Sequence, residues 1–215
     1  MDLRNDLSVL LKNSYKPQKD AKEEYKKLGY DYDHDLSKMN SKVVVKNGVP
    51  TIIHRGSKTL QDWLDDGLLA FGLEHYSKRF KDAKELTKKV EEKYKTGANS
   101  VGHSLGGSLA EKSNTHGQII TYNKASGLAD IGKKKNSKRQ LDVRTDGDIV
   151  SLLNSTQKAN HETIKNKKQS KNPFENILTA HNTDNLFREP DNTDRLIKQE
   201  ETATDLDDML GSSIV

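Results

Sequence analysis

The feature that most constrains this chain is a serine between two glycines within residues 101–110, which read Val-Gly-His-Ser-Leu-Gly-Gly-Ser-Leu-Ala. The spacing Gly102-x-Ser104-x-Gly106 is typical of a tight strand-to-helix turn that projects a nucleophilic serine. Backbone presses on both sides of such a turn, so a side chain at either glycine would collide. The following residues predict a helix whose free N–H groups point at the reacting centre. The N–H of Leu105 is then placed to stabilise an oxyanion.

Composition limits how much core the chain can build. Apolar residues are 32% of the 215 residues, less than is usual in soluble proteins. They concentrate at residues 43–45, 49–53, 68–71, 118–122 and 148–153, which makes a core possible. The 36 basic and 32 acidic residues leave a net charge of +4, too small an excess to indicate a nucleic-acid partner. The absence of cysteine excludes disulfides, a thiol nucleophile and a thiolate metal site.

Predicted helices and strands alternate along the chain. The patterns predict helices over 3–13, 18–28 and 77–95, and strands over 42–46, 49–54, 98–101, 117–122 and 140–144. Asn47-Gly48 predicts a hairpin turn. The strand before Ser104 is short and polar, and residues 154–172 are polar and basic and predict a loop. This alternation favours an α/β fold, with a mainly parallel sheet flanked by helices and an N-terminal helical segment.

We expect one domain over residues 1–188, followed by an acidic C-terminal tail over 189–215. The first residues carry acids and lack a long apolar run, so no signal peptide is expected. No stretch approaches the roughly 20 apolar residues of a membrane span. These features favour a cytoplasmic or virion-associated protein over a secreted one.

A serine nucleophile needs a histidine to take its proton and an acid to orient that histidine. In hydrolases with this serine turn, the acid and then the histidine follow the serine in the chain. His116 follows too soon, at the far end of the helix that leaves the turn. His161 lies in a lysine-rich polar run, whereas His181 has the apolar Ile177 and Leu178 beside it. His181 is therefore the favoured base, with His161 as the alternative.

Two aspartates compete for the role of the acid. Asp146 precedes Gly147 and is suited to forming a turn. Asp148 directly precedes the apolar Ile149-Val150 and is better anchored, so it is favoured. His103 is expected to form a wall of the pocket and not to act as the base, because neighbours on a tight turn point apart. The glycine-flanked apolar run 67–72 suits either a loop over a pocket or an ordinary core segment.

In these segments the chain resembles the class 3 lipases of the α/β-hydrolase superfamily. The matching motifs follow the family's order over residues 40–187, and only the serine turn is a strong signal by itself. They are His54-Arg55-Gly56-Ser57, Asp62-Trp63, Gly102 to Ala110, and Asp148-Ile149-Val150. The compact, lysine-rich and cysteine-free chain is more similar to virus-encoded or intracellular members than to secreted fungal lipases.

The resemblance implies Ser104 as the nucleophile, Asp148 as the acid and His181 as the base. It also implies an oxyanion hole formed by Ser57 and the N–H of Leu105.

A lid is implied after Trp63. The predicted substrate and lid residues are Trp63, Leu68, Leu69, Phe71 and His103. The chain departs from the family at His54, which replaces an aromatic residue, and in its short lid region.

The predicted function is hydrolysis of carboxylic esters by a lipase or esterase, with phospholipid as one candidate substrate and no metal or organic cofactor. The expected partner is a lipid or small ester. The basic segments 133–139 and 165–171 suit peripheral contact with an anionic membrane. The alternative is a catalytically inactive module of the same fold that binds a membrane or serves as a structural, particle-associated protein.

Overall fold

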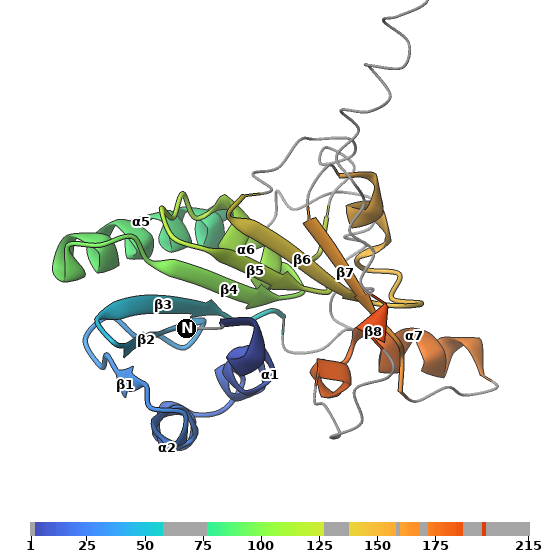
Figure 1. Ribbon diagram of the computed structural model, residues 1–215, viewed down its shortest axis with the longest axis horizontal. Coiled ribbons are helices and arrows are strands. Elements are labelled where there is room, and N and C mark those ends of the chain that lie inside the picture. Colours follow the sequence, from blue (N-terminus) through green and yellow to red (C-terminus); the bar gives the residue numbers. More distant parts are fainter. Residues whose placement is uncertain are drawn as a thin grey trace, which may run out of the picture.

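The computed structural model describes residues 3–57, 77–126, 138–157, 160–167, 172–186 and 195–196. Within them, eight strands form one sheet in the order of the chain (Figure 1). The strands are β1 (Asp31–Tyr32), β2 (Ser41–Lys46), β3 (Val49–His54), β4 (Asn99–His103), β5 (Ile119–Tyr122), β6 (Gln140–Thr145), β7 (Asn160–Ile164) and β8 (Arg195–Leu196). The helices are α1 (Leu3–Ser14), α2 (Gln18–Lys27), α5 (Ser77–Tyr94), α6 (Leu105–Lys112) and α7 (Pro173–His181), with short 3₁₀ helices η3 (Leu152–Thr156) and η4 (Thr183–Leu186).

The central strands of the sheet are parallel. β3, β4, β5, β6 and β7 pair in parallel with their neighbours, while β1, β2 and β8 add antiparallel pairs at the two edges. Parallel neighbours end at the same edge of a sheet, where the functional loops of such folds lie. The predicted α/β fold with a mainly parallel sheet is confirmed.

The hairpin of β2 and β3 turns at Asn47-Gly48, as predicted. Both residues have positive φ angles, 54° for Asn47 and 77° for Gly48. This is the backbone that a two-residue type I′ turn requires, and asparagine and glycine tolerate it best. The turn sets the register of the pair, in which Lys46 faces Val49.

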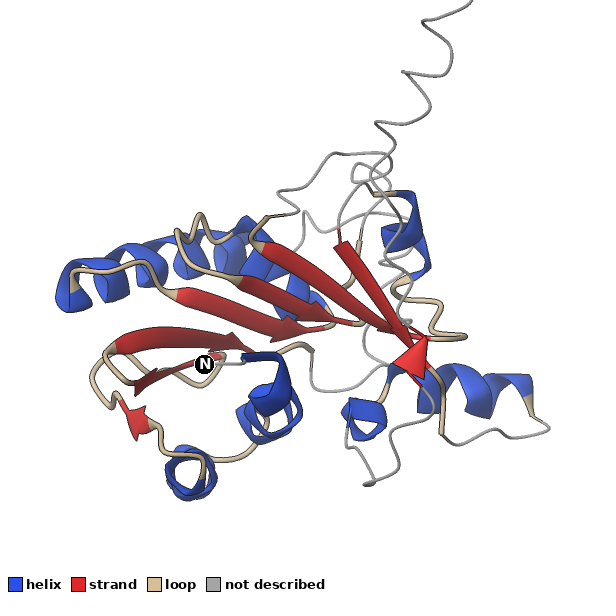
Figure 2. Cartoon of the chain, viewed as in Figure 1, coloured by secondary structure: helices blue, strands red, loops and turns tan. Residues whose placement is uncertain are grey.

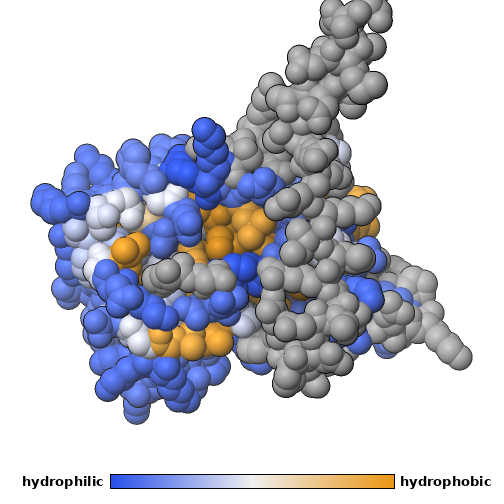
Figure 3. Space-filling model, in the orientation of Figure 1, coloured by the Kyte–Doolittle hydropathy of each residue, from blue (hydrophilic) through white to orange (hydrophobic). Residues whose placement is uncertain are grey.

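Helices cover both faces of the sheet (Figure 2). On one face, α1, α2 and Tyr30, which follows α2, bury apolar side chains against strand residues: Leu3, Leu7, Leu10, Leu11, Tyr25 and Tyr30 pack with Val44, Ile53, Val101, Ile120 and Val143. On the other face, α5 packs Leu86 and Val90 against Val43 and Ile52. The few apolar residues thus suffice because they are concentrated in these layers, and Figure 3 shows apolar side chains over the sheet framed by polar ones.

The buried polar side chains of β4 are hydrogen-bonded to neighbouring segments. Asn99 Oδ1 accepts from the N–H of Gln118 at 3.0 Å, and Ser113 Oγ donates to Ser100 Oγ at 3.4 Å. Both Asn99 and Ser100 are buried. A short polar strand is therefore compatible with a central position beside the serine turn.

The predicted loop over 154–172 is wrong in part, because residues 160–164 form strand β7 and pair in parallel with β6. Polar residues of this strand have hydrogen-bond partners within the protein. Glu162 accepts two hydrogen bonds from Arg4 of α1, at 2.6 and 3.0 Å, and His161 Nε2 donates to the carbonyl of Gln157 at 2.8 Å. A partner as distant as Arg4 is not visible in a local sequence pattern.

None of the helices in the described part of the chain combines the length and apolar character that crossing a membrane requires. The predicted lid, the basic run 133–137 and the predicted tail, apart from β8, lie outside the described residues. The division into a domain over 1–188 and a tail over 189–215 stays a prediction.

Candidate active site

Ser104 lies at the sharp turn between β4 and α6. Its backbone has φ 56° and ψ −127°, a conformation that costs free energy for a residue with a side chain. Hydrogen bonds from the neighbouring strand hold it there. The N–H of Ser104 donates to the carbonyl of Tyr122 at 3.0 Å, and its own carbonyl accepts from the N–H of Ala125 at 3.1 Å. Strain held in this way is typical of a nucleophile turn.

The two glycines of the motif allow the backbone to approach closely on both sides of Ser104. A Cβ on Gly102 would overlap the carbonyl of Gly106, and a Cβ on Gly106 would overlap the carbonyl of His54. The collision predicted from the spacing is therefore present at both positions.

Asp148 and His181 meet beside this turn. Asp148 follows the end of β6, His181 ends α7, and His181 Nδ1 donates to Asp148 Oδ1 at 2.9 Å. Burial would raise the pKa of Asp148, but the hydrogen bonds from His181 and Ser151 hold its pKa below the usual value. The Asp148 carboxylate thus stays charged and able to orient the imidazole.

Polar residues at the end of β5 fix the end of α7, which carries His181. Asn123 donates to the carbonyl of Ala180 at 2.8 Å, and its Oδ1 accepts from the N–H of Thr145 at 2.7 Å. Tyr122 Oη donates to the carbonyl of Asn182 at 3.0 Å. The sequence analysis missed both side chains. The available signal was their position at the end of a buried strand: Tyr122 is the last residue of β5 and Asn123 follows it.

His181 also lies close to the serine turn itself. Its ring centroid is 4.8 Å from that of His103, the residue before Ser104. No hydrogen bond joins Ser104 Oγ to His181 among the described residues. Catalytic hydrogen bonds are often long in free enzymes and tighten when substrate binds.

Ser57 lies three residues after the end of β3, in a segment that packs on the serine turn. The preceding residue, Gly56, packs on the turn, since a Cβ there would lie 2.8 Å from the His103 carbonyl and 3.1 Å from Ser104 Cβ. The hydroxyl of Ser57 is buried without a hydrogen-bond partner in the described part of the protein. Leu105 is the first residue of α6, so its N–H has no partner within the helix.

The alternative acid and bases lie elsewhere. Asp146 is exposed, in a turn with Gly147 at φ 79°. His161 is buried but turned to the Gln157 carbonyl. His116 is on the surface, where its Nδ1 lies 2.7 Å from Glu91. The structure thus pairs Asp148 with His181 beside His103, the residue before Ser104, and leaves the others apart.

Trp63, Leu68, Leu69 and Phe71, the predicted lid and substrate residues, lie outside the described residues. The place of His103 in the pocket wall stays a prediction. This histidine is only 7% exposed, and both ring nitrogens are hydrogen-bonded within the protein, so it offers a substrate no free polar group.

A buried ion cluster lies behind the turn. Lys124, which is 1% exposed, donates to Glu111 of α6 at 2.5 Å, to Asp142 of β6 at 2.7 Å and to Gln157 at 3.1 Å. Gly107 of α6 packs on Lys124, since a Cβ added to Gly107 would lie 3.0 Å from the Cβ of Lys124. The cluster therefore joins α6 to the sheet.

Replacing Lys124 by methionine should lower the free energy of unfolding by roughly 3–5 kcal/mol at pH 7, because two buried carboxylates lose their cation. Urea unfolding measures the change. Lys46→Met is the control, since its pair with Asp6 is partly exposed and should contribute about 1 kcal/mol or less. Equal losses in the two variants would contradict the structural role of the cluster.

Two buried histidines should make the fold acid-sensitive. Burial lowers the pKa of His54 and of His103 to about 3, helped by the charge of Arg79 at His54 and by His181 at His103. In the unfolded chain their pKa is about 6.5. Between these values the unfolded state binds more protons, so stability falls as pH falls below about 6.5.

Between pH 6.5 and 5, the loss should approach about 1.4 kcal/mol per pH unit for each of these histidines. Urea unfolding across this range, above the usual carboxylate titration, measures the slope. His54→Gln should remove the His54 share of the slope. A slope that this substitution leaves unchanged would contradict the assignment.

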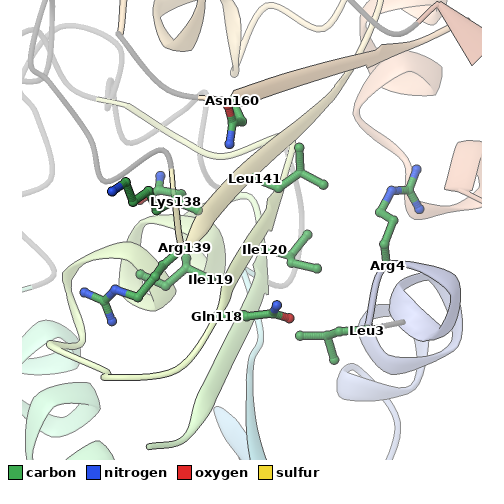
Figure 4. A pocket seen from close by; sticks show the side chains of 10 residues that line it. Leu3, Arg4, Gln118, Ile119, Ile120, Lys138, Arg139, Leu141 and Asn160 are labelled. Atoms are coloured by element: carbon green, nitrogen blue, oxygen red, sulfur yellow. The ribbon is translucent and has the colours of Figure 1, made fainter. Parts of the chain in front are cut away.

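A hollow of about 250 Å³ lies at the opposite edge of the sheet, where β5, β6 and β7 begin (Figure 4). Its two arginines are engaged within the protein: Arg4 pairs with Glu162, and Arg139 donates to the carbonyl of Thr115. Neither Ser104 nor the residues around it line this hollow. The candidate active site is therefore at the carboxyl edge of the strands.

Comparison with known proteins agrees with the α/β fold. A fungal lipase, solved with an inhibitor and described as a model for interfacial activation in lipases, matches with a TM-score of 0.50. The match has 14% identity over 75% of this chain and 78% of the fungal chain, which establishes the fold. A comparison with curated proteins gives no match.

A family model of phospholipase-like proteins, described as a Tle-like phospholipase domain, matches residues 14–199. With the structural match, it confirms the lipase-family assignment made from the sequence. Because this model spans most of the chain, the protein belongs to the family of Tle-like phospholipase domains.

Proposed function

We propose that this protein is a serine hydrolase that cleaves carboxylic esters of lipids, with phospholipid as its main substrate class. The observation that carries the proposal is the hydrogen bond between His181 Nδ1 and Asp148 Oδ1 beside the strained turn of Ser104. A buried carboxylate, an oriented histidine and a serine on a nucleophile turn are the groups that ester hydrolysis requires.

In the first half of the reaction, Ser104 Oγ attacks the ester carbonyl carbon and passes its proton to His181 Nε2. Asp148 stabilises the imidazolium that forms. The carbonyl oxygen becomes an oxyanion and accepts hydrogen bonds from Ser57 Oγ and the N–H of Leu105. Each such donor contributes on the order of 10²–10³ to the rate. The imidazolium then protonates the leaving alcohol, and an acyl-enzyme remains.

In the second half, His181 removes a proton from water, which attacks the acyl-enzyme through a second oxyanion at the same donors. Collapse of this intermediate returns the proton from His181 to Ser104 Oγ and releases the fatty acid. No step in this cycle uses a metal or an organic cofactor.

Family membership supports phospholipid over other esters, since the matching model is named for a phospholipase domain. Among the described residues, Lys165 and Lys167 are exposed on the loop after β7. We propose that these cations contribute to peripheral contact with anionic head groups, which attract basic segments.

The test is hydrolysis of phosphatidylglycerol and phosphatidylcholine vesicles, with a chromogenic ester series from acetate to palmitate in parallel. The wild type should release fatty acid and lysolipid, because a carboxylic ester is cut. Ser104→Ala should lower kcat by roughly 10⁴-fold or more, because the nucleophile is lost. Ser113→Ala, a buried serine at the other end of α6, should retain activity and serves as the control.

Three results would contradict the proposal. Activity unchanged in Ser104→Ala would remove the nucleophile assignment, and release of the head group would indicate phosphodiester cleavage. A folded wild type that binds vesicles and hydrolyses nothing would instead identify a binding module with a hydrolase fold.

A further inference from the structure

A chain of hydrogen bonds runs beneath the candidate active site and uses two residues that the mechanism leaves without a role, Tyr15 and His103. The N–H of Gly56 donates to Tyr15 Oη at 3.1 Å. Tyr15 Oη lies 2.7 Å from His103 Nδ1, and His103 Nε2 lies 2.8 Å from the carbonyl oxygen of His181. The chain therefore connects the loop that carries Ser57 with the backbone of His181.

The chemistry of the partners fixes the direction of each bond. A carbonyl oxygen only accepts, so His103 Nε2 carries the proton that it donates to His181. Burial lowers the pKa of His103 to about 3, so the ring is neutral and Nδ1 is an acceptor. Tyr15 Oη therefore donates to Nδ1 and uses its lone pair for the N–H of Gly56. Burial raises the pKa of Tyr15 to about 12, which keeps this hydroxyl protonated.

Packing holds both rings in place. The His103 ring makes an edge contact with Tyr15 at 5.9 Å and stacks on Tyr122 at 5.5 Å. Its centroid is 4.8 Å from that of His181. Gly56 approaches so closely that a Cβ there would lie 2.6 Å from Tyr15 Oη. The chain thus lies in a close-packed region where a shift of one member displaces the next.

We propose that Tyr15 and His103 are positioning residues for the hydrolysis, which hold the Ser57 loop and His181 at a fixed separation across Ser104. This inference rests on the proposed function. Neither residue touches the reacting atoms. Tyr15 acts through Gly56 on the adjacent Ser57, and His103 acts through the carbonyl of His181.

Such a link should affect turnover more than substrate binding. The oxyanion donor and the base matter in the transition state, and a displacement of about 1 Å can lower the rate about 10²-fold. Loss of an interaction that operates only in the transition state lowers kcat and leaves KM unchanged. A residue with a purely structural role would instead lower stability without this separation of kcat from KM.

The experiment compares Tyr15→Phe with Tyr25→Phe on the same chromogenic ester. Tyr25 is the matched control, because it is fully buried on α2 and its Oη donates to the Leu10 carbonyl at 3.0 Å, within the helical layer. Tyr15→Phe should lower kcat by about 10- to 100-fold with KM within about twofold. Tyr25→Phe should keep its kcat, while both variants lose stability to a similar extent.

Two further comparisons identify the route of the effect. If Tyr15 acts through the oxyanion donor, Tyr15→Phe should lower kcat much less in a Ser57→Ala background than in the wild type, because coupled residues are non-additive. On the other side, His103→Gln retains a donor for the His181 carbonyl, whereas His103→Leu does not. The glutamine variant should therefore be the more active of the two.

The outcomes separate the inference from the function on which it rests. An active wild type in which Tyr15→Phe is as fast as Tyr25→Phe overturns the inference alone. The inference is also overturned if Tyr15→Phe lowers kcat by the same factor in the Ser57→Ala background as in the wild type and if His103→Gln and His103→Leu are equally active. A wild type that hydrolyses none of the esters overturns the proposed function, and the inference with it.

Discussion

Asp148→Asn should lower kcat by roughly 10³- to 10⁴-fold while the protein stays folded, since an amide can neither stabilise the imidazolium nor hold the required tautomer of the histidine. The bond from His181 Nδ1 to Asp148 Oδ1 is 2.9 Å, and the Asp148 side chain is buried. Because the site is buried, solvent cannot compensate for the lost carboxylate charge, so the decrease in kcat should be large.

The matched control is Asp146→Asn, which removes the same charge two residues earlier in the chain. Asp146 is exposed, and its turn is set by Gly147. Initial rates with a chromogenic butyrate ester should differ from wild type by about twofold or less in this control. A comparable loss in both variants, or a fully active Asp148→Asn, would contradict the assignment of the acid.

Gly102→Ala should prevent stable folding, with a loss of more than about 5 kcal/mol of unfolding free energy. The added Cβ would overlap the carbonyl of Gly106 within the first turn of α6. That oxygen belongs to backbone and cannot rotate away as a flexible side chain could. Relief of the clash would require α6 to move away from β4, which would separate the serine turn from the sheet.

Gly48→Ala tests whether this effect comes from crowding. Gly48 has φ 77° and open space around it, so alanine there should cost about 1–2 kcal/mol from its backbone conformation alone. Soluble yield and urea unfolding measure both variants. A Gly102→Ala protein that unfolds at the same urea concentration as Gly48→Ala would disprove the close approach at the turn.

The parts of the fold that were predicted from the sequence depend on local chemistry. Asn47-Gly48 specifies its turn because both residues adopt positive φ easily. The serine turn was visible in part because Gly102 is required by its contact with Gly106, only four residues away. Asp148 could be chosen over Asp146 because the apolar residues after it predicted an anchored position, and Asp148 is buried whereas Asp146 is exposed.

The parts that were missed depend on contacts between distant segments. Strand β7 has the composition of a loop, and its Glu162 is paired with Arg4, 158 residues away. Tyr15 and His103 are 88 residues apart and meet only because α1 packs across the end of β4. Nothing in the sequence distinguishes Lys124 from an ordinary surface cation, but in the fold Glu111 and Asp142 pair with it. No local pattern contains such information.

The central claim is that Ser104 is a nucleophile activated by His181. The most direct test is to label the folded protein with a fluorophosphonate and to identify the labelled residue by peptide mapping. The rate of labelling is then compared between the wild type and His181→Ala. The account predicts one adduct, on Ser104, that forms at least about 10³-fold more slowly in His181→Ala, because the serine loses its base. An adduct on another residue, or labelling of Ser104 at the same rate in both proteins, would contradict it.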